Sequence, residues 1–266
     1  MAYDSQQQAS AVASAATVAA PQGPAAMAAA LNARLREASP QEILRAALAY
    51  APGRVALVSS FGAESAVLLH MVSTLDPSTP VLFLDTGQLF AQTLEYRRAL
   101  TERLGLTDVR DLRPAYADLA VHDPKADLWK TDTDLCCEIR KVRPLDRVLL
   151  PDFDGWITGR KRFHGGARVN LPVVEAGAEG KLKFNPLANW SKAQLDAYMA
   201  EHDLPSHPLV EFGYPSVGCW PCTKPVESGD ASDIRAGRWQ GSDKTECGIH
   251  TPRSVLAGDQ DLGGDI

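Results

Sequence analysis

The five cysteines of this chain fall into groups that suggest two different kinds of chemistry. Cys136 and Cys137 are adjacent, and Cys219 and Cys222 are separated by two residues. Cys247 stands by itself near the C-terminal end. Two close pairs supply the four thiolates that a four-iron cluster requires, and the remaining cysteine could be a nucleophile. The sequence therefore suggests a metal-cluster site together with a reactive thiol.

Other interpretations of the two cysteine pairs fit less well. A disulfide framework is not favoured, because the cysteines are sparse and odd in number, and close pairs in a reducing compartment usually bind metal. Zinc is an alternative, although its sites usually use ligands two to four residues apart, and a vicinal pair fits tetrahedral geometry poorly. Buried cysteines without a ligand are a third reading. Lys141 follows Cys137 by one helical turn, so its ammonium could lie near the thiolates.

The neighbours of Cys247 bear on its reactivity. Lys244 and His250 lie three residues to either side, and positive charge favours the reactive thiolate. Glu246 acts in the opposite direction, so no pKa follows from the sequence. An exposed cysteine without a catalytic role is the alternative.

Two further stretches could bind an anion. Residues 59–65 (SSFGAES) join an apolar run to a helical pattern, and such small residues allow backbone amides to approach a phosphate. The stretch is not a Walker loop, because it lacks the Gly-Lys-Ser/Thr ending, and a simple tight turn is the alternative. Basic residues gather at 160–162 with Arg168, and again at Arg235 and Arg238. A solvated loop or an RNA contact are alternatives, but the acidic chain favours a small anion.

The elements that would position these residues alternate along the chain. Strands are predicted at 54–58, 81–84, 109–112 and 156–158, and the first two are apolar runs typical of buried strands. Helices are predicted at 27–36, 39–50, 66–75, 89–104 and 191–202, two of them opened by capping boxes at Ser39 and Ser191. A small edge hairpin is predicted at 171–175 and 181–184, and mostly loop after 204. This order predicts an α/β fold with a mainly parallel twisted sheet flanked by helices, with the loops 59–65, 85–87 and 159–168 sharing one site.

Composition limits the classes of function. The chain has 266 residues, 45% of them hydrophobic, and a net charge of −6, which argues against a protein that coats nucleic acid or an anionic membrane. It contains no apolar run of about eighteen residues, so no membrane span is expected. Residues 1–25 are interpreted as a disordered tail without signal-peptide character, residues 26–230 as one domain, and residues 231–266 as a loop-rich mobile segment. A cytoplasmic protein is expected.

Seven segments in this order resemble the sulfonucleotide reductases, specifically the assimilatory adenylyl-sulfate (APS) reductases of bacteria and plants. They are SSFGAES, LDTGQLF, LCCEIRKVRPL, TGRKRFHGGAR, YPSVGCWPCTKPV, RAGRW and KTECGIH. The resemblance covers the chain from about Arg54 to His250. It implies an adenine-nucleotide α-hydrolase-like fold and the reduction of APS to sulfite and AMP, in sulfate assimilation and cysteine biosynthesis. Thioredoxin or glutaredoxin would supply the electrons.

The resemblance also implies roles for particular residues. Cys247 would attack the sulfate sulfur and carry an S-sulfocysteine intermediate. The ligands of a [4Fe-4S] cluster would be Cys136, Cys137, Cys219 and Cys222. Substrate-binding residues would be Ser59, Ser60, Thr86, Gly87, Lys141, Gly159, Arg160, Arg168, Arg235, Arg238 and His250. The chain departs from the pattern at 163–166, where many relatives have Asp-Gln-Ser or Gln-Ser, so contacts of this loop, which could bear on 3′-phosphate selection, transfer least.

Three rival functions remain. A reductase of 3′-phosphoadenylyl sulfate (PAPS) would share the chemistry, but such enzymes typically lack the two cysteine pairs. An ATP-pyrophosphatase-type tRNA sulfurtransferase would require an SGGxDS loop, which is absent. A non-enzymatic iron–sulfur sensor would leave Cys247, the arginines and the nucleotide loops unexplained. The sequence does not fix the oligomeric state, and a homo-oligomer is compatible with it.

Overall fold

The computed structural model describes residues 22–177, 180–226, 233–241 and 244–250. The predicted N-terminal tail falls on residues 1–21 for most of its length, outside this range. In the described part of the chain, no helix is both long enough and apolar enough to cross a membrane.

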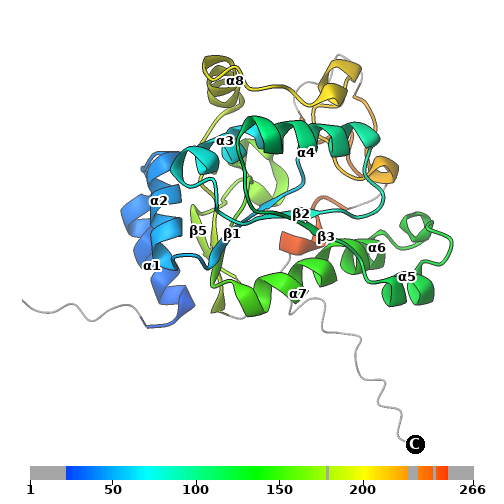
Figure 1. Cartoon of the computed structure of the whole chain (residues 1–266), viewed down its shortest axis with the longest axis horizontal. Helices are drawn as coiled ribbons and strands as arrows, with labels where there is room; N and C mark the ends of the chain where they lie inside the picture. The colour runs from blue at the N-terminus through cyan, green and yellow to red at the C-terminus, as the bar shows by residue number, and fades with distance from the viewer. Residues whose placement is uncertain (1–21, 178–179, 227–232, 242–243, 251–266) are drawn as a thin grey trace, which may run out of the picture.

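A six-stranded sheet forms the centre of the molecule (Figure 1). Its strands are β1 (Val55–Ser59), β2 (Val81–Leu84), β3 (Val109–Leu112), β4 (Gly155–Ile157), β5 (Val174–Ala176) and β6 (Leu182–Phe184). They lie in the order β3-β2-β1-β4-β6-β5, and only β5 runs antiparallel to its neighbour. The predicted mainly parallel sheet and its edge hairpin, β5 with β6, are confirmed.

Alternate side chains of the central strands enter two separate cores, as the two-residue period of a strand requires. Val55 and Leu57 of β1 pack into the larger core, and Ala56 and Val58 into the smaller. The larger core lies under α1 (Pro24–Leu35), α2 (Pro40–Tyr50), α3 (Ser65–Leu75), α4 (Ala91–Arg103) and α8 (Lys192–Glu201). The smaller lies under α7 (Arg143–Asp152), which crosses the opposite face of the sheet in Figure 1. Burial on both faces explains why the strands read as continuous apolar runs.

The predicted helices are present with small shifts at their ends. Both predicted capping boxes form: the Ser39 side chain accepts a hydrogen bond from the Glu42 amide, and the Ser191 side chain does the same for Gln194. Each glutamate or glutamine side chain in turn accepts from the backbone amide of its serine. These reciprocal bonds satisfy amides that would otherwise lack partners in the first turn.

A helical region between 116 and 152 was not predicted as regular structure. It consists of α5 (Tyr116–His122), a 3₁₀ turn η1 (Leu128–Lys130), α6 (Thr133–Cys137), a π-helical turn η2 (Glu138–Val142), and α7. Helix α5 buries none of its residues, so no apolar period marks it. A buried ion pair between Arg140 and Asp123, with Nη2 and Oδ2 2.5 Å apart, fastens this region internally. Arg140 Nη1 also donates to the Thr86 carbonyl at 2.7 Å, which joins the region to the loop after β2.

Among the residues after α8 that the structure describes, most form loops, as predicted, and three short 3₁₀ turns are present: η6 (Pro208–Phe212), η7 (Trp220–Cys222) and η8 (Gly248–His250). His207 opens η6: its Nδ1 accepts a hydrogen bond from the Leu209 amide at 3.1 Å. Its Nε2 lies 3.0 Å from the Thr93 hydroxyl on α4. The ring is fully buried.

A pH dependence follows from this histidine. Burial lowers the pKa of His207 to about 4, whereas a histidine in an opened chain titrates near pH ~6.5. Between these two pH values, His207 binds a proton in the locally unfolded state but not in the folded state. The free energy of local unfolding therefore falls as the pH decreases through this window. We expect hydrogen exchange at the Leu209 amide, corrected for its intrinsic rate, to accelerate as the pH falls from about 6.5 toward 4. In His207→Asn, which can still accept from this amide, that acceleration should be absent; an unchanged pH profile would contradict the assignment.

Candidate active site

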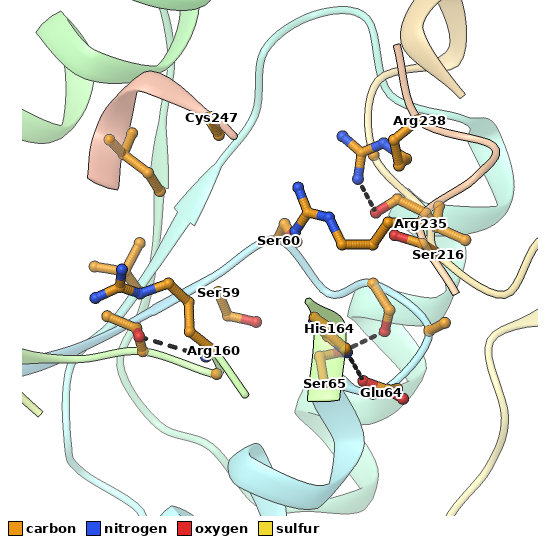
Figure 2. A pocket seen from close by; sticks show the side chains of 18 of the residues that line it. Ser59, Ser60, Glu64, Ser65, Arg160, His164, Ser216, Arg235, Arg238 and Cys247 are labelled. Carbon is orange, nitrogen blue, oxygen red and sulfur yellow. Dashed lines mark hydrogen bonds and ion pairs between the residues drawn. The ribbon is translucent and has the colours of Figure 1, made fainter. Parts of the chain in front are cut away.

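The site lies where the strand order reverses. From β1 the chain proceeds to β2 and β3 on one side, whereas β4 pairs with β1 on the other side. In parallel sheets such a switch point leaves a crevice at the carboxyl ends of the two strands. The turns that follow β1 and β4 both reach a cavity of about 220 Å³, which the C-terminal segment also lines (Figure 2).

Most residues that the sequence analysis assigned to a site line this cavity. They are Ser59, Ser60, Thr86, Lys141, Gly159, Arg160, Arg168, Cys219, Arg235, Arg238, Cys247 and His250. Each of the three loops predicted to share one site contributes to the wall. Gly87, Cys136, Cys137 and Cys222 are outside the lining set. Gly87 has a φ of 70°, and a Cβ added there would lie 3.5 Å from Arg140 Nη1.

The turn after β1 has an unusual backbone conformation, and its polar groups line the cavity. The Ser59 hydroxyl accepts a hydrogen bond from the Phe61 amide at 3.1 Å, and Phe61 adopts a positive φ of 48°. The Phe61 ring compensates by packing, fully buried, edge-on against Phe83. A Cβ on Gly62 would lie 3.2 Å from the Val217 carbonyl, so a larger residue would press this turn against the loop before Cys219. No side chain caps α3, and although the Ser65 amide donates to the Gly62 carbonyl at 3.1 Å, the helix N-terminus still presents its positive end toward the cavity.

A chain of charged groups crosses the cavity wall. Lys161 Nζ lies 2.8 Å from Glu64 Oε2, and the same oxygen lies 3.0 Å from His164 Nε2. Arg168 Nη1 donates to His164 Nδ1 at 3.0 Å. Because an arginine nitrogen can only donate, Nδ1 must be the acceptor, so His164 is neutral and donates from Nε2 to Glu64. Burial opposes the ionisation of Glu64, but Lys161 and His164 outweigh it and lower its pKa to about 2.

The same chain of groups continues into the C-terminal segment through Arg168 and Glu246. Arg168 Nε and Nη2 donate to the two carboxylate oxygens of Glu246, at 2.6 and 2.7 Å. Arg235 Nη2 lies 3.6 Å from Glu246 Oε1 and donates to the Thr245 carbonyl at 2.9 Å. Burial lowers the pKa of Arg235 to about 10, and the nearby Arg168 also contributes. Glu64, Lys161, His164 and Glu246 lie within the quoted motifs, but the sequence analysis gave none of them an individual role in substrate binding or catalysis.

Cys247 lies against the helix that carries the vicinal cysteine pair. Its thiol and that of Cys137 are hydrogen-bonded, and this contact lowers the pKa of Cys247 well below its usual value, against the effect of burial. Lys141 and the Ile249 amide act in the same direction. Lys141 Nζ also lies 3.8 Å from Cys137 Sγ. Lys244, which the sequence suggested as a neighbouring charge, is bonded to Asp134 of α6.

His250 and Arg238 are each held in place by contact with a tryptophan ring. The His250 ring stacks on Trp156 of β4, with centroids 5.8 Å apart and planes 5° from parallel. Burial, followed by the charge of Arg160, lowers the pKa of His250 well below its usual value, so the ring is neutral. Arg238 lies over the backbone at Gly218, where any Cβ would overlap its guanidinium, and stacks on Trp239 at 4.5 Å.

The other four cysteines converge from two segments. All are free thiols, and those of Cys136, Cys137 and Cys219 are buried. Burial raises the pKa of Cys136 to about 11; Arg140 opposes this, and Cys219 and Cys222 raise it further. The Thr86 hydroxyl lies 3.3 Å from Cys219 Sγ.

The arrangement of these thiols bears on which metal group they could hold. Within the described residues, no group of three or more His, Cys, Asp or Glu side chains is arranged to hold a metal ion. A four-iron cluster makes a different demand, because each thiolate binds a different iron around a body of several atoms. Cys136 lies close enough to Cys219 and Cys222 for their charges to act on its pKa, and Lys141 Nζ lies 3.8 Å from Cys137 Sγ. Two pairs of thiols with an ammonium beside one of them are chemically suited to that demand.

A family assignment follows from comparison with known proteins. Residues 54–225 match the phosphoadenosine phosphosulfate reductase domain. This chain therefore belongs to the phosphoadenosine phosphosulfate reductase family, and the expectation of an enzyme of the sulfonucleotide reductase type is confirmed.

Individual relatives carry more specific names. An adenosine 5′-phosphosulfate reductase of Chelativorans sp. is 53% identical over 200 residues, covering 75% of this chain and 80% of that protein. One of Mesorhizobium japonicum is 49% identical over 229 residues, covering 86% and 89%. A phosphoadenosine 5′-phosphosulfate reductase of Gloeobacter violaceus is 40% identical over 218 residues, covering 80% and 88%.

Solved structures confirm the fold class. The crystal structure of a phosphoadenylyl-sulfate reductase from Candida auris, in a phosphate complex, superimposes with a TM-score of 0.63 at 30% identity, covering 75% of this chain and 96% of that one. An FMN adenylyltransferase of Candida glabrata gives a TM-score of 0.51 at 14% identity, covering 82% and 76%, which indicates a shared fold alone.

Proposed function

We propose that this chain reduces adenylyl sulfate to sulfite and AMP, with Cys247 as the nucleophile and a dithiol protein of the thioredoxin or glutaredoxin type as the reductant. The observation that carries the proposal is the position of Cys247: it lies in the wall of a cavity that also contains Lys141, Arg168, Arg235 and Arg238. A thiol with a lowered pKa facing several fixed cations suits attack on an anionic sulfur centre.

The first step is a displacement at sulfur. The Cys247 thiolate attacks the sulfur of the sulfate group, a sulfur–sulfur bond forms, and the bond from sulfur to the bridging oxygen breaks. AMP leaves with the electron pair of that bond, and Cys247 carries an S-sulfonate. Negative charge grows on the departing phosphate, and the arginines and Lys141 would stabilise it without reorganisation. Apolar side chains in the same wall, Leu68, Leu89 and Leu187, suit an adenine ring.

The second step requires electrons from outside the chain. A thiolate of the partner protein attacks Cys247 Sγ and forms a mixed disulfide, and sulfite leaves with the electron pair of the sulfur–sulfur bond. The partner's second thiol then releases Cys247 and becomes part of the partner's own disulfide. The dithiol is thus oxidised by two electrons, and the sulfur of the substrate is reduced from the sulfate to the sulfite level.

The family resemblance includes a four-iron cluster, and the donor set supports it. Cys136, Cys137, Cys219 and Cys222 would hold the cluster, and it would add charge and shape next to the cavity. A Cys137 thiolate bound to iron has no S–H to donate to Cys247. Lys141 would then be the principal group that keeps the Cys247 thiol ionised, because its half-buried ammonium lies 3.8 Å from Cys137 Sγ and its charge lowers the pKa of Cys247.

The substrate assignment is tested by turnover. We expect anaerobically purified protein with thioredoxin to release sulfite from adenylyl sulfate at least about tenfold faster, in kcat/KM, than from its 3′-phosphorylated form. The matched control omits thioredoxin, which should limit AMP release to one equivalent per Cys247. A preference for the 3′-phosphorylated substrate would leave the proposed reaction intact but show that the assignment of adenylyl sulfate as the substrate is wrong. Release from neither would overturn the proposal.

A further inference from the structure

Arg168 and Arg235, two of the cations that the proposed reaction requires, already hold an anion that belongs to the protein. Arg168 offers both Glu246 oxygens a hydrogen bond from a separate nitrogen, and its remaining nitrogen donates to His164. Arg235 lies 3.6 Å from the same carboxylate. All three side chains are largely buried, with 10%, 13% and 18% of the Arg168, Arg235 and Glu246 side chains exposed. Glu246 therefore occupies the place where a substrate anion would meet these two guanidinium groups.

The Glu246 carboxylate is also tied to the nucleophile. Its Oε1 accepts a hydrogen bond from the Cys247 backbone amide at 3.0 Å. In this position the Cys247 thiol contacts Cys137, on the helix that carries the vicinal cysteine pair. A movement of the carboxylate away from Arg168 therefore also removes this hydrogen bond from the Cys247 backbone and weakens the hold on the segment.

We propose that Glu246 is a displaceable counter-ion of the anion site. A nucleotide with a terminal anionic group would replace its carboxylate on Arg168 and Arg235 and thereby release residues 244–250 from the resting position. The identity of the anion, a phosphosulfate, rests on the proposed function; the displacement itself rests on the contacts above. Glu246 is then a positioning residue that couples nucleotide binding to the freeing of Cys247.

The exchange has a thermodynamic consequence. Nucleotide affinity is lowered by the free energy needed to remove Glu246 from the two arginines, and removing its charge should return part of that free energy to binding. Bidentate, charge-assisted pairs of this kind are stronger than neutral hydrogen bonds. Glu246→Gln keeps the size and an accepting oxygen but loses the charge, so it weakens the resting contact without creating a cavity.

The test uses ADP, whose terminal phosphate stands in for the sulfate group and cannot react. With the full-length, anaerobically purified protein, we expect Glu246→Gln to lower the Kd for ADP by about tenfold at low salt. The Kd for adenosine, which has no anionic group, should change less than about twofold. Glu175→Gln is the matched control, because Glu175 pairs with Arg160 and also neutralises a cation near the site without contacting the C-terminal segment. It should leave hydrogen exchange in residues 244–250 unchanged.

Hydrogen exchange in residues 244–250 distinguishes displacement from a general effect of charge. Saturating ADP should accelerate exchange there in the unaltered protein, whereas in Glu246→Gln exchange should already be fast without ADP. Protection of these amides by ADP, or weaker ADP binding by Glu246→Gln, would overturn this inference alone. Failure of every variant to bind ADP would overturn the proposed nucleotide chemistry along with it.

Discussion

We expect replacement of Cys247 with serine to abolish sulfite release, by a factor of at least about 10⁴, while the iron content and visible absorbance expected of the cluster stay unchanged. Serine has nearly the same shape, but its hydroxyl is a far poorer nucleophile at neutral pH than a thiolate. The loss should appear in kcat, because the thiol acts on sulfur in the chemical step. The measurement is sulfite formation with saturating adenylyl sulfate and thioredoxin.

A second readout identifies the intermediate on the same residue. When the unaltered protein reacts with adenylyl sulfate and no reductant, the peptide that contains Cys247 should gain the mass of one SO₃ group, and one equivalent of AMP should appear. The Cys247→Ser protein should give neither. If the variant lost iron and activity together, Cys247 could not be separated from the cysteines assigned to the cluster, and the division of roles would be wrong.

The sequence alone predicts the central strands well because β1, β2 and β4 are buried on both faces. Val81–Leu84 and Val109–Leu112 are found at the predicted bounds, and the ends of the flanking helices differ from the predicted ends by at most three residues. The helix starts at Ser39 and Ser191 are also predicted correctly from the sequence, because a capping box depends only on the spacing of neighbouring residues. Short local motifs and the patterns of apolar residues in strands are therefore sufficient to predict most of the fold.

The region between 116 and 152 shows where such signals fail. Helix α6 is only five residues long and is started by Asp132, whose side chain accepts from two amides of the first turn. A buried ion pair, Arg140 with Asp123, joins residues 17 apart in sequence. Neither feature produces a periodic pattern of apolar residues in the sequence. The sequence did place Lys141 near Cys137 from helical spacing, and the ammonium lies 3.8 Å from that sulfur even though the turn is π-helical.

The pairing of charges in the site was beyond sequence reasoning for a different reason. Glu246 was treated as a neighbour that disfavours the Cys247 thiolate. In the structure its charge is directed to Arg168, 78 residues away, and the groups acting on the thiol are Cys137 and Lys141. The sign of a local charge effect depends on which distant side chain neutralises that charge, and only the three-dimensional arrangement supplies that information.

The second large effect is expected at Cys219. We predict that Cys219→Ser loses iron and sulfite formation together, with activity falling at least about a hundredfold. Cys219 is buried in the wall of the cavity, with the Thr86 hydroxyl 3.3 Å from its sulfur. Serine could keep that hydrogen bond, but it replaces a thiolate with an oxygen that iron–sulfur clusters bind weakly. The measurement pairs iron content and visible absorbance with the sulfite assay.

Trp220→Phe is the matched control for Cys219→Ser, because Trp220 is the next residue along the chain, has 48% of its surface exposed, and offers no metal ligand. It should keep the iron and most of the activity. Hydrogen exchange in α1 and α2 should match in both variants, since both helices pack in the larger core and neither lines the cavity that contains Cys219. Iron retained by Cys219→Ser would remove this cysteine from the ligand set. Full activity in iron-free protein would show instead that Lys141 and the arginines suffice to activate Cys247 without the cluster.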